Sequence, residues 1–117
     1  MRTLNEILST KVAREGVKTD LNRLVGDIDL NNYIDDMIAN NSNNIFFDYC
    51  SDKYELFCEV YIDKEKENYL LEIGLIEPNG GTENSFLAIF DKNLKRIMQD
   101  YNKCVWSAGD WEPIKQL

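Results

Sequence analysis

The stretch from Tyr54 to Ile62 alternates strictly between two kinds of side chain, and this alternation constrains the fold more than any other feature of the chain. A period of two is typical of a β-strand whose two faces meet different surroundings. One face would carry Leu56, Cys58, Val60 and Ile62, and the other would carry Glu55, Phe57, Glu59 and Tyr61. We therefore expect a sheet with one uniformly apolar face.

Neighbouring segments extend this strand into an antiparallel sheet. The stretches 46–50, 69–76 and 83–90 have the composition of strands, and the Asn79-Gly80 pair supplies the positive φ angles of a hairpin turn. With loops at 52–53, 63–68 and 78–81, Leu56 would pair with Leu75, and Ile73 with Phe86. This register keeps the apolar side chains on one face, as a core requires.

Helical spacing of apolar residues predicts three short segments before the sheet: residues 3–14, a segment around 20–25, and a segment that begins after Asp29 and runs to 38. Asp91 is a suitable N-cap for a final helix that would carry Leu94, Ile97, Met98 and Tyr101. We therefore expect an α+β fold in a single domain, residues 1–117. It would consist of N-terminal helices, a four-stranded antiparallel β-meander, a C-terminal helix and an aromatic tail.

Composition argues against several classes of function. The 117 residues include no histidine, the residue that proteins use most often as a general base and as a metal ligand. The three cysteines are too widely spaced for a zinc site or a redox pair. Residues 27–38 begin like a calcium-binding loop, but Asn32 replaces its glycine and Ile38 replaces its glutamate, so a capped helix explains them as well. We expect no enzymatic activity, no metal and no cofactor.

Charge is distributed unevenly along the chain. Residues 24–91 hold fifteen acidic and three basic side chains, a net charge of −12, whereas the whole chain carries −8. Because 44% of the residues are hydrophobic, this acidic block belongs to a folded domain rather than to a disordered chain, and it points to a cationic partner. The same charge repels nucleic acid, and the sequence has neither a basic stripe nor a phosphate-binding loop. The expected partner is therefore a basic protein.

The second face of the predicted sheet is the main candidate for the binding surface. Aromatic rings interleaved with carboxylates suit a basic protein, because the rings supply desolvated contact area and the acids steer and orient the partner. The candidate residues on this face are Asp48, Glu55, Phe57, Glu59, Tyr61 and Glu72. The alternative is that an N-terminal helix covers the face, which the apolar residues Leu70, Leu87 and Ile89 favour at one end.

The tail contains two tryptophans, Trp106 and Trp111, which either dock onto the domain or face a partner. Docking is the usual fate of a tryptophan, because its large ring is normally well buried. The acidic Asp110 beside Trp111 keeps the partner-facing role open. Asp110 and Trp111 therefore complete the set of candidate partner-binding residues.

In size, acidity and α+β plan, the chain resembles the small acidic immunity proteins with which bacteria neutralise secreted toxins, including those of contact-dependent inhibition. The resemblance implies an inhibitor that binds a basic toxin or nuclease domain one-to-one and blocks its active site or substrate groove. Two alternatives stay open: a secretion chaperone or adaptor that binds a client segment, and an anti-defence mimic of nucleic acid.

The N-terminal residues lack the apolar core of a signal peptide, and no apolar stretch has the length of a membrane span. An odd number of cysteines fits a reducing compartment. We therefore expect a cytoplasmic protein that is a monomer on its own and does not bind membranes.

Overall fold

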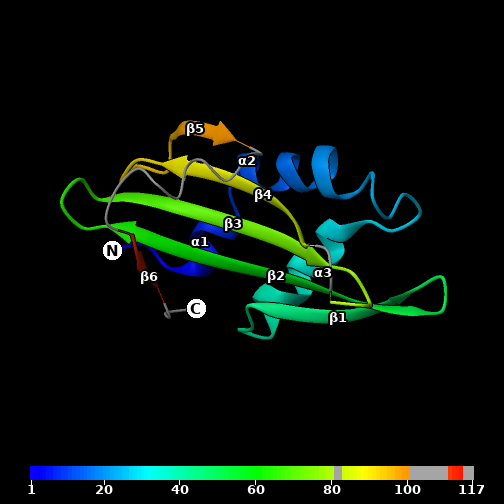
Figure 1. Cartoon of the computed structure of the whole chain (residues 1–117). Coiled ribbons are helices and arrows are strands. Elements are labelled where there is room, and N and C mark those ends of the chain that lie inside the picture. The colour runs from blue at the N-terminus through cyan, green and yellow to red at the C-terminus, as the bar shows by residue number, and fades with distance from the viewer. Residues whose placement is uncertain (81–82, 101–110, 115–117) are drawn as a thin grey trace.

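A computed structural model shows a helical N-terminal part followed by an antiparallel sheet (Figure 1), and it describes residues 1–80, 83–100 and 111–114. The helical segments are α1 (Leu4–Leu8), α2 (Lys11–Gly16), the π-helical η1 (Val17–Leu21) and α3 (Leu30–Ala39). The strands are β1 (Asn44–Tyr49), β2 (Asp52–Asp63), β3 (Asn68–Ile76), β4 (Glu83–Phe90), β5 (Arg96–Asp100) and β6 (Glu112–Pro113). The expected α+β class is confirmed.

Side-chain caps divide the N-terminal part into short helices. The continuous helix expected over residues 3–14 is wrong, because Thr10 accepts the N–H of Ala13 (3.3 Å) and begins a new helix. α2 ends at Gly16, and η1 follows directly at Val17. Asp29 caps α3 as expected, since its Oδ1 accepts the N–H of Asn31 at 3.0 Å. The capped helix, rather than a calcium loop, thus accounts for this carboxylate.

The central registers of the sheet are those that the alternation predicts. In β2 and β3, Leu56 lies opposite Leu75, and between β3 and β4, Ile73 lies opposite Phe86. The turn between β1 and β2 differs from the expectation, because it occupies Cys50 and Ser51 rather than residues 52–53. Both turn residues have positive φ angles, 52° and 68°, which is the geometry that a two-residue hairpin requires.

The four-stranded meander is incomplete, and the expected C-terminal helix is wrong, because β5 follows β4 as a further antiparallel strand. Asp91 closes a turn instead of opening a helix: its Oδ1 accepts the N–H groups of Asn93 (2.9 Å) and Lys95 (3.0 Å). Its own N–H donates to the carbonyl of Lys95 at 2.9 Å. Leu94 has a φ of 60°, which no helix accepts, so the chain reverses onto β4.

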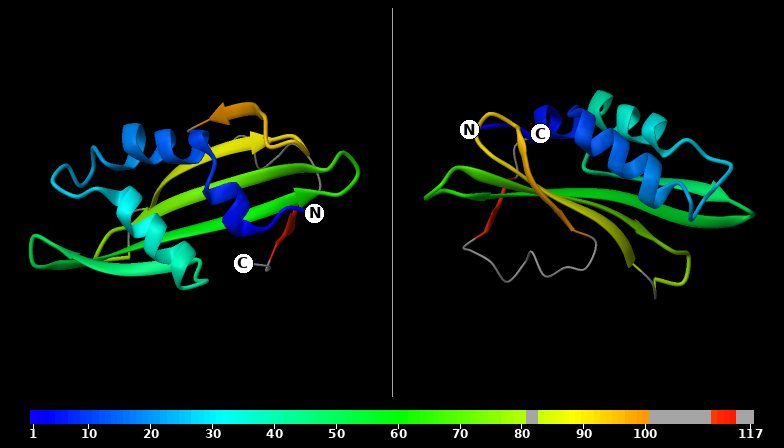
Figure 2. Two further views of the ribbon diagram at one scale, coloured as in Figure 1. Left: turned by 180° about the vertical axis from the view of Figure 1, so that it is seen from behind. Right: turned by 90° about the horizontal axis from the view of Figure 1, so that it is seen from above.

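The described strands form one sheet in the order β1-β2-β3-β4-β5, and β6 pairs with β2. β6 and β1 share the same edge of β2, because Ile114 donates its N–H to the carbonyl of Val60 (2.7 Å) and Cys58 donates to that of Asn43 (2.8 Å). All the described helices lie on one face of the sheet (Figure 2). None of these helices is long and apolar enough to cross a membrane.

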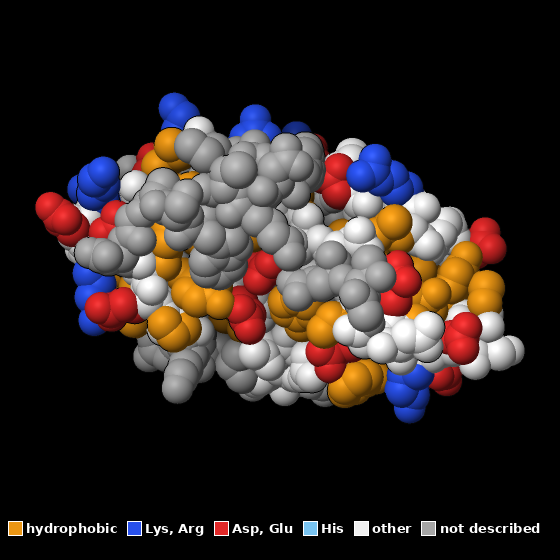
Figure 3. Space-filling model, in the orientation of Figure 1, with side chains coloured by type: hydrophobic (Ala, Val, Ile, Leu, Met, Phe, Trp, Pro, Cys, Tyr) orange, Lys and Arg blue, Asp and Glu red, His pale blue; other side chains and the backbone are white. Residues whose placement is uncertain are grey.

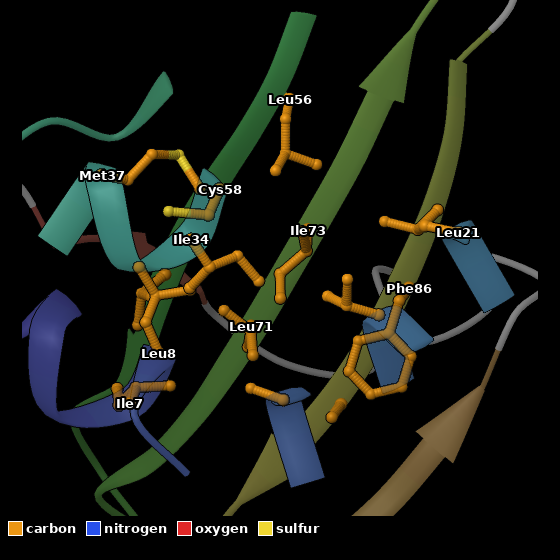
Figure 4. Close-up of a cluster of buried hydrophobic side chains, with 14 of the residues drawn as sticks. Ile7, Leu8, Leu21, Ile34, Met37, Leu56, Cys58, Leu71, Ile73 and Phe86 are labelled. Carbon is orange, nitrogen blue, oxygen red and sulfur yellow. The ribbon is translucent and has the colours of Figure 1, made fainter. Parts of the chain in front are cut away.

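The core fills the space between the helices and the sheet. Figure 4 shows Leu56, Cys58, Leu71 and Ile73 of the sheet meeting side chains from α1, α3 and η1. Phe86 stands at the centre of the contact with α2 and η1, and its side chain is 0% exposed. The single apolar face that the alternation predicts is therefore the face that the helices cover.

A close approach of helix and sheet depends on Gly16. A Cβ atom at this position would lie 2.2 Å from Cζ of Phe86, far inside van der Waals contact. Because the Phe86 ring is fully buried, it has no free space into which to move. Glycine is thus required where α2 crosses β4.

We expect Gly16→Ala to lower the free energy of unfolding by about 1–3 kcal/mol through overpacking, more than offsetting the helix-propensity gain of about 1 kcal/mol. Gly26→Ala is the matched control, because a Cβ at Gly26 meets nothing within 4 Å. Urea unfolding followed by circular dichroism measures both. Equal midpoints for the two variants would contradict the packing of Gly16 against Phe86.

Candidate functional site

The side of the sheet turned away from the helices, here called the outer face, carries the residues of the second alternating set. The registers place Phe46 opposite Glu55, and Glu59 opposite Glu72. Tyr61 lies opposite Leu70, at the far end of the same strand pair. Figure 3 views the outer face and shows acidic and hydrophobic side chains next to one another over its described part. No described helix covers the outer face, so the three-layer alternative is not what the structure shows.

Four of the candidate residues come together in an open groove of about 370 Å³, here called the acidic groove. Its walls include Asn43, Asn44, Glu55, Phe57, Glu59 and Glu72. The described residues that line the groove include no basic side chain. The groove therefore presents carboxylates and an aromatic ring to solvent, with amide groups at one side.

Phe57 lies flat on the sheet rather than pointing away from it. Its partner across β2 and β3 is Gly74, and a Cβ at Gly74 would lie 2.2 Å from Cζ of Phe57. The ring thus occupies the space that any other residue at position 74 would fill, an arrangement known to protect strand glycines. Phe57 is therefore held in one place as a half-exposed wall of the acidic groove.

Two carboxylates of the groove, those of Glu59 and Glu72, lie next to each other on neighbouring strands. Glu59 and Glu72 are direct cross-strand partners, and like charges in such positions are destabilising. The hydroxyl of Tyr61 donates a hydrogen bond to Oε2 of Glu59 and so orients that side chain. Glu72 is 6% exposed, whereas Glu59 is exposed. The oriented and exposed carboxylate of Glu59 can bind a lysine or arginine by charge-assisted hydrogen bonds.

The remaining candidates lie apart from the acidic groove. Asp48 is exposed near the β1–β2 turn, opposite Lys53. Trp111 is half-buried, and it packs against a small apolar cluster on the outer face formed by Leu70, Leu87 and Ile89. The structure thus docks Trp111 onto the sheet, beside Tyr61. Asp110 and Trp106 lie outside the described residues.

The indole nitrogen Nε1 of Trp111 is buried and donates no hydrogen bond to any described atom. Glu112, which follows Trp111 in the chain, forms an ion pair with Lys64, with 2.8 Å between Oε2 and Nζ. Both side chains of this pair are largely exposed, so it contributes little to stability. The docking of the tail at Trp111 therefore rests on apolar contact of the indole ring and on the backbone pairing of β6 with β2.

The groove walls Asn43 and Asn44 were not among the expected site residues. They belong to the asparagine-rich stretch 40–44, whose composition predicts only a polar loop, although Asn44 is the first residue of β1. Gly74 was also missed, although the predicted register already places it opposite Phe57. A glycine facing an aromatic residue across two strands is the signal that identifies it.

Possible metal ligands and thiols can be located in the part of the chain that the structure describes. No group of three or more histidine, cysteine, aspartate or glutamate side chains is arranged there to hold a metal ion. Cys58 is fully buried in the core, and Cys50 is exposed in the β1–β2 turn. Burial raises the pKa of the Cys58 thiol from 9.0 to about 12, so this thiol stays protonated and unreactive at neutral pH.

Comparisons of the chain with protein-family models, with curated proteins and with solved structures find no match. The observation that bears on function is therefore the geometry of the outer face.

In a Cys104→Ser background, we expect a disulfide reagent to label Cys50 rapidly in the native protein and Cys58 only after unfolding. Burial favours the neutral thiol and so raises the pKa of Cys58. The free energy of unfolding therefore keeps the full contribution of this thiol below pH 9 and loses it as the pH rises toward about 12. Labelling followed by mass spectrometry locates the modified thiol. Native-state labelling of Cys58 at a rate similar to that of Cys50 would contradict its burial.

Proposed function

We propose that this chain is a stoichiometric inhibitor of the immunity-protein kind, which neutralises a basic protein such as a nuclease toxin. The observation that carries the proposal is the convergence of Glu55, Phe57 and Glu59 on one open groove of the outer face. The groove occupies the acidic part of the chain, residues 24–91. A surface of this kind is complementary to a site built to hold phosphates.

The residues of the groove would contribute to binding in different ways. Glu55 and Glu59 attract a cationic site over a distance and then pair with its lysines or arginines. Phe57, held over Gly74, offers a rigid apolar wall that loses little conformational entropy when a partner covers it. The protein would act as a one-to-one binder without chemistry of its own, in the cytoplasm of the cell that makes it.

A secretion chaperone or adaptor is the second candidate function. The observation that favours it is a more apolar groove of about 410 Å³ beside the acidic groove, whose walls include Leu4, Val60, Pro113 and Ile114. An apolar client segment would fit such walls. A chaperone of this kind would bind several loosely folded clients, whereas an inhibitor would bind one folded partner.

We expect Glu55→Lys with Glu59→Lys to weaken capture of the basic partner by at least about tenfold and to flatten its salt dependence, because two attractive contacts become repulsive. The measurement is a pull-down from native-host lysate with a salt gradient, analysed by mass spectrometry. Glu15→Lys with Asp36→Lys is the matched control, since it makes the same charge change at exposed positions of the helical layer.

The wild type and the control variant should retain one basic protein at a one-to-one ratio, released by salt. Equal retention by the Glu55/Glu59 variant would refute the assignment of the site. Retention of several clients that only denaturant releases would contradict the inhibitor proposal and support the chaperone function.

A further inference from the structure

β1 forms one edge of the described sheet, next to the acidic groove. We infer that this edge takes an extended, basic segment of the partner as an added antiparallel strand, with its basic side chains on the outer face. The inference rests on the proposed function, because it specifies how a basic partner is held. Three observations support the inference: the direction of the backbone groups of β1, the side chains of β1, and the charge around that strand.

The backbone of β1 has hydrogen-bonding groups directed away from the sheet. Cys58 of β2 donates to the carbonyl of Asn43, so alternate residues from Asn43 onward bond to β2. The N–H and C=O groups of Phe46 and Asp48 therefore point to the opposite side, where no described strand pairs with β1. An incoming strand would find two residues with open donors and acceptors there.

The open edge has a defined beginning. Asn44 also faces outward, but it donates its N–H to Oγ of Ser42 (3.3 Å), and the Ser42 hydroxyl donates to its carbonyl (2.9 Å). The Ser42 side chain thus takes the hydrogen bonds that a strand residue opposite Asn44 would make. The usable edge thus comprises Phe46 to Asp48.

Apart from the charged Asp48, β1 lacks the devices that usually keep a sheet edge from pairing. Its register with β2 is uninterrupted, and its six residues include no lysine and no proline. The opposite edge differs, because the β4–β5 register shifts between Ile89 and Phe90, and β5 begins with Arg96 after Lys95. The protection is therefore present at one edge and missing at the edge beside the acidic groove.

The side chains at the edge select a basic strand. Phe46 is 57% exposed on the outer face, and its partner on β2 is Glu55. A lysine or arginine opposite Phe46 would lie across the ring and point toward Glu55, about 10 Å from its own backbone at two strand spacings. A second basic residue, two positions away, would lie opposite Asp48. The chemistry that fits is a segment with basic residues at alternate positions.

The test uses an eight-residue peptide of alternating lysine and valine, with hydrogen–deuterium exchange of the full chain. The peptide should protect the amides of Phe46 and Asp48, and a glutamate–valine peptide should not. N-methylation of the lysines removes the donors that would face β1 and should weaken binding by about tenfold or more. N-methylation of the valines is the matched control and should leave binding nearly unchanged, because their N–H groups point away.

Equal binding by the two methylated peptides, or binding without protection of Phe46 and Asp48, would overturn the inference. Protection that appears without peptide and grows with protein concentration would also overturn it, because a second copy would then occupy the edge. If the Glu55/Glu59 variant loses its partner while the edge stays unprotected here, the proposed function stands and only the added strand falls.

Discussion

The pairing of β2 with β3 is the constraint on which the rest of the structure depends. With Leu56 opposite Leu75, every apolar residue of the alternating set faces the helices. A slip of one residue would turn the carboxylates of β2 into the core, at a cost that no small domain can bear. The close packing of α2 against Phe86 follows from this register. Phe86 lies opposite Ile73, on the face of the sheet that the helices cover.

The same register that builds the core assembles the outer face. It brings Glu59 opposite Glu72 and lays Phe57 over Gly74, so the acidic groove is a consequence of strand pairing rather than of a loop. Like charges in direct opposition repel each other, and the described residues that line the groove include no basic side chain. A surface with this arrangement of carboxylates is complementary to a cationic partner. The open edge of β1 lies beside this surface and would give such a partner a backbone to pair with.

Much of this arrangement could be predicted from the sequence, because a period of two leaves only one register with a clean core. The C-terminal helix could not be excluded in the same way. Asp91 suits a helix cap and a turn equally well, and the spacing of Leu94 and Ile97 does not separate the two. The pairing of the following residues with the edge of β4 decides between them, and that pairing is not encoded in the local spacing. The docking of Trp111 and the walls at Asn43 and Asn44 likewise depend on where distant strands begin and end.

The central claim is that the carboxylates of the acidic groove serve a partner and not the fold. The most direct test is the free energy of unfolding of the isolated protein with Glu55→Gln and Glu59→Gln, measured at low and at high salt. The account predicts a gain of about 0.5–1 kcal/mol at low salt that shrinks at high salt, because a like-charge repulsion is removed. A loss of stability at both salt concentrations would contradict it, since the carboxylates would then be part of what holds the sheet together.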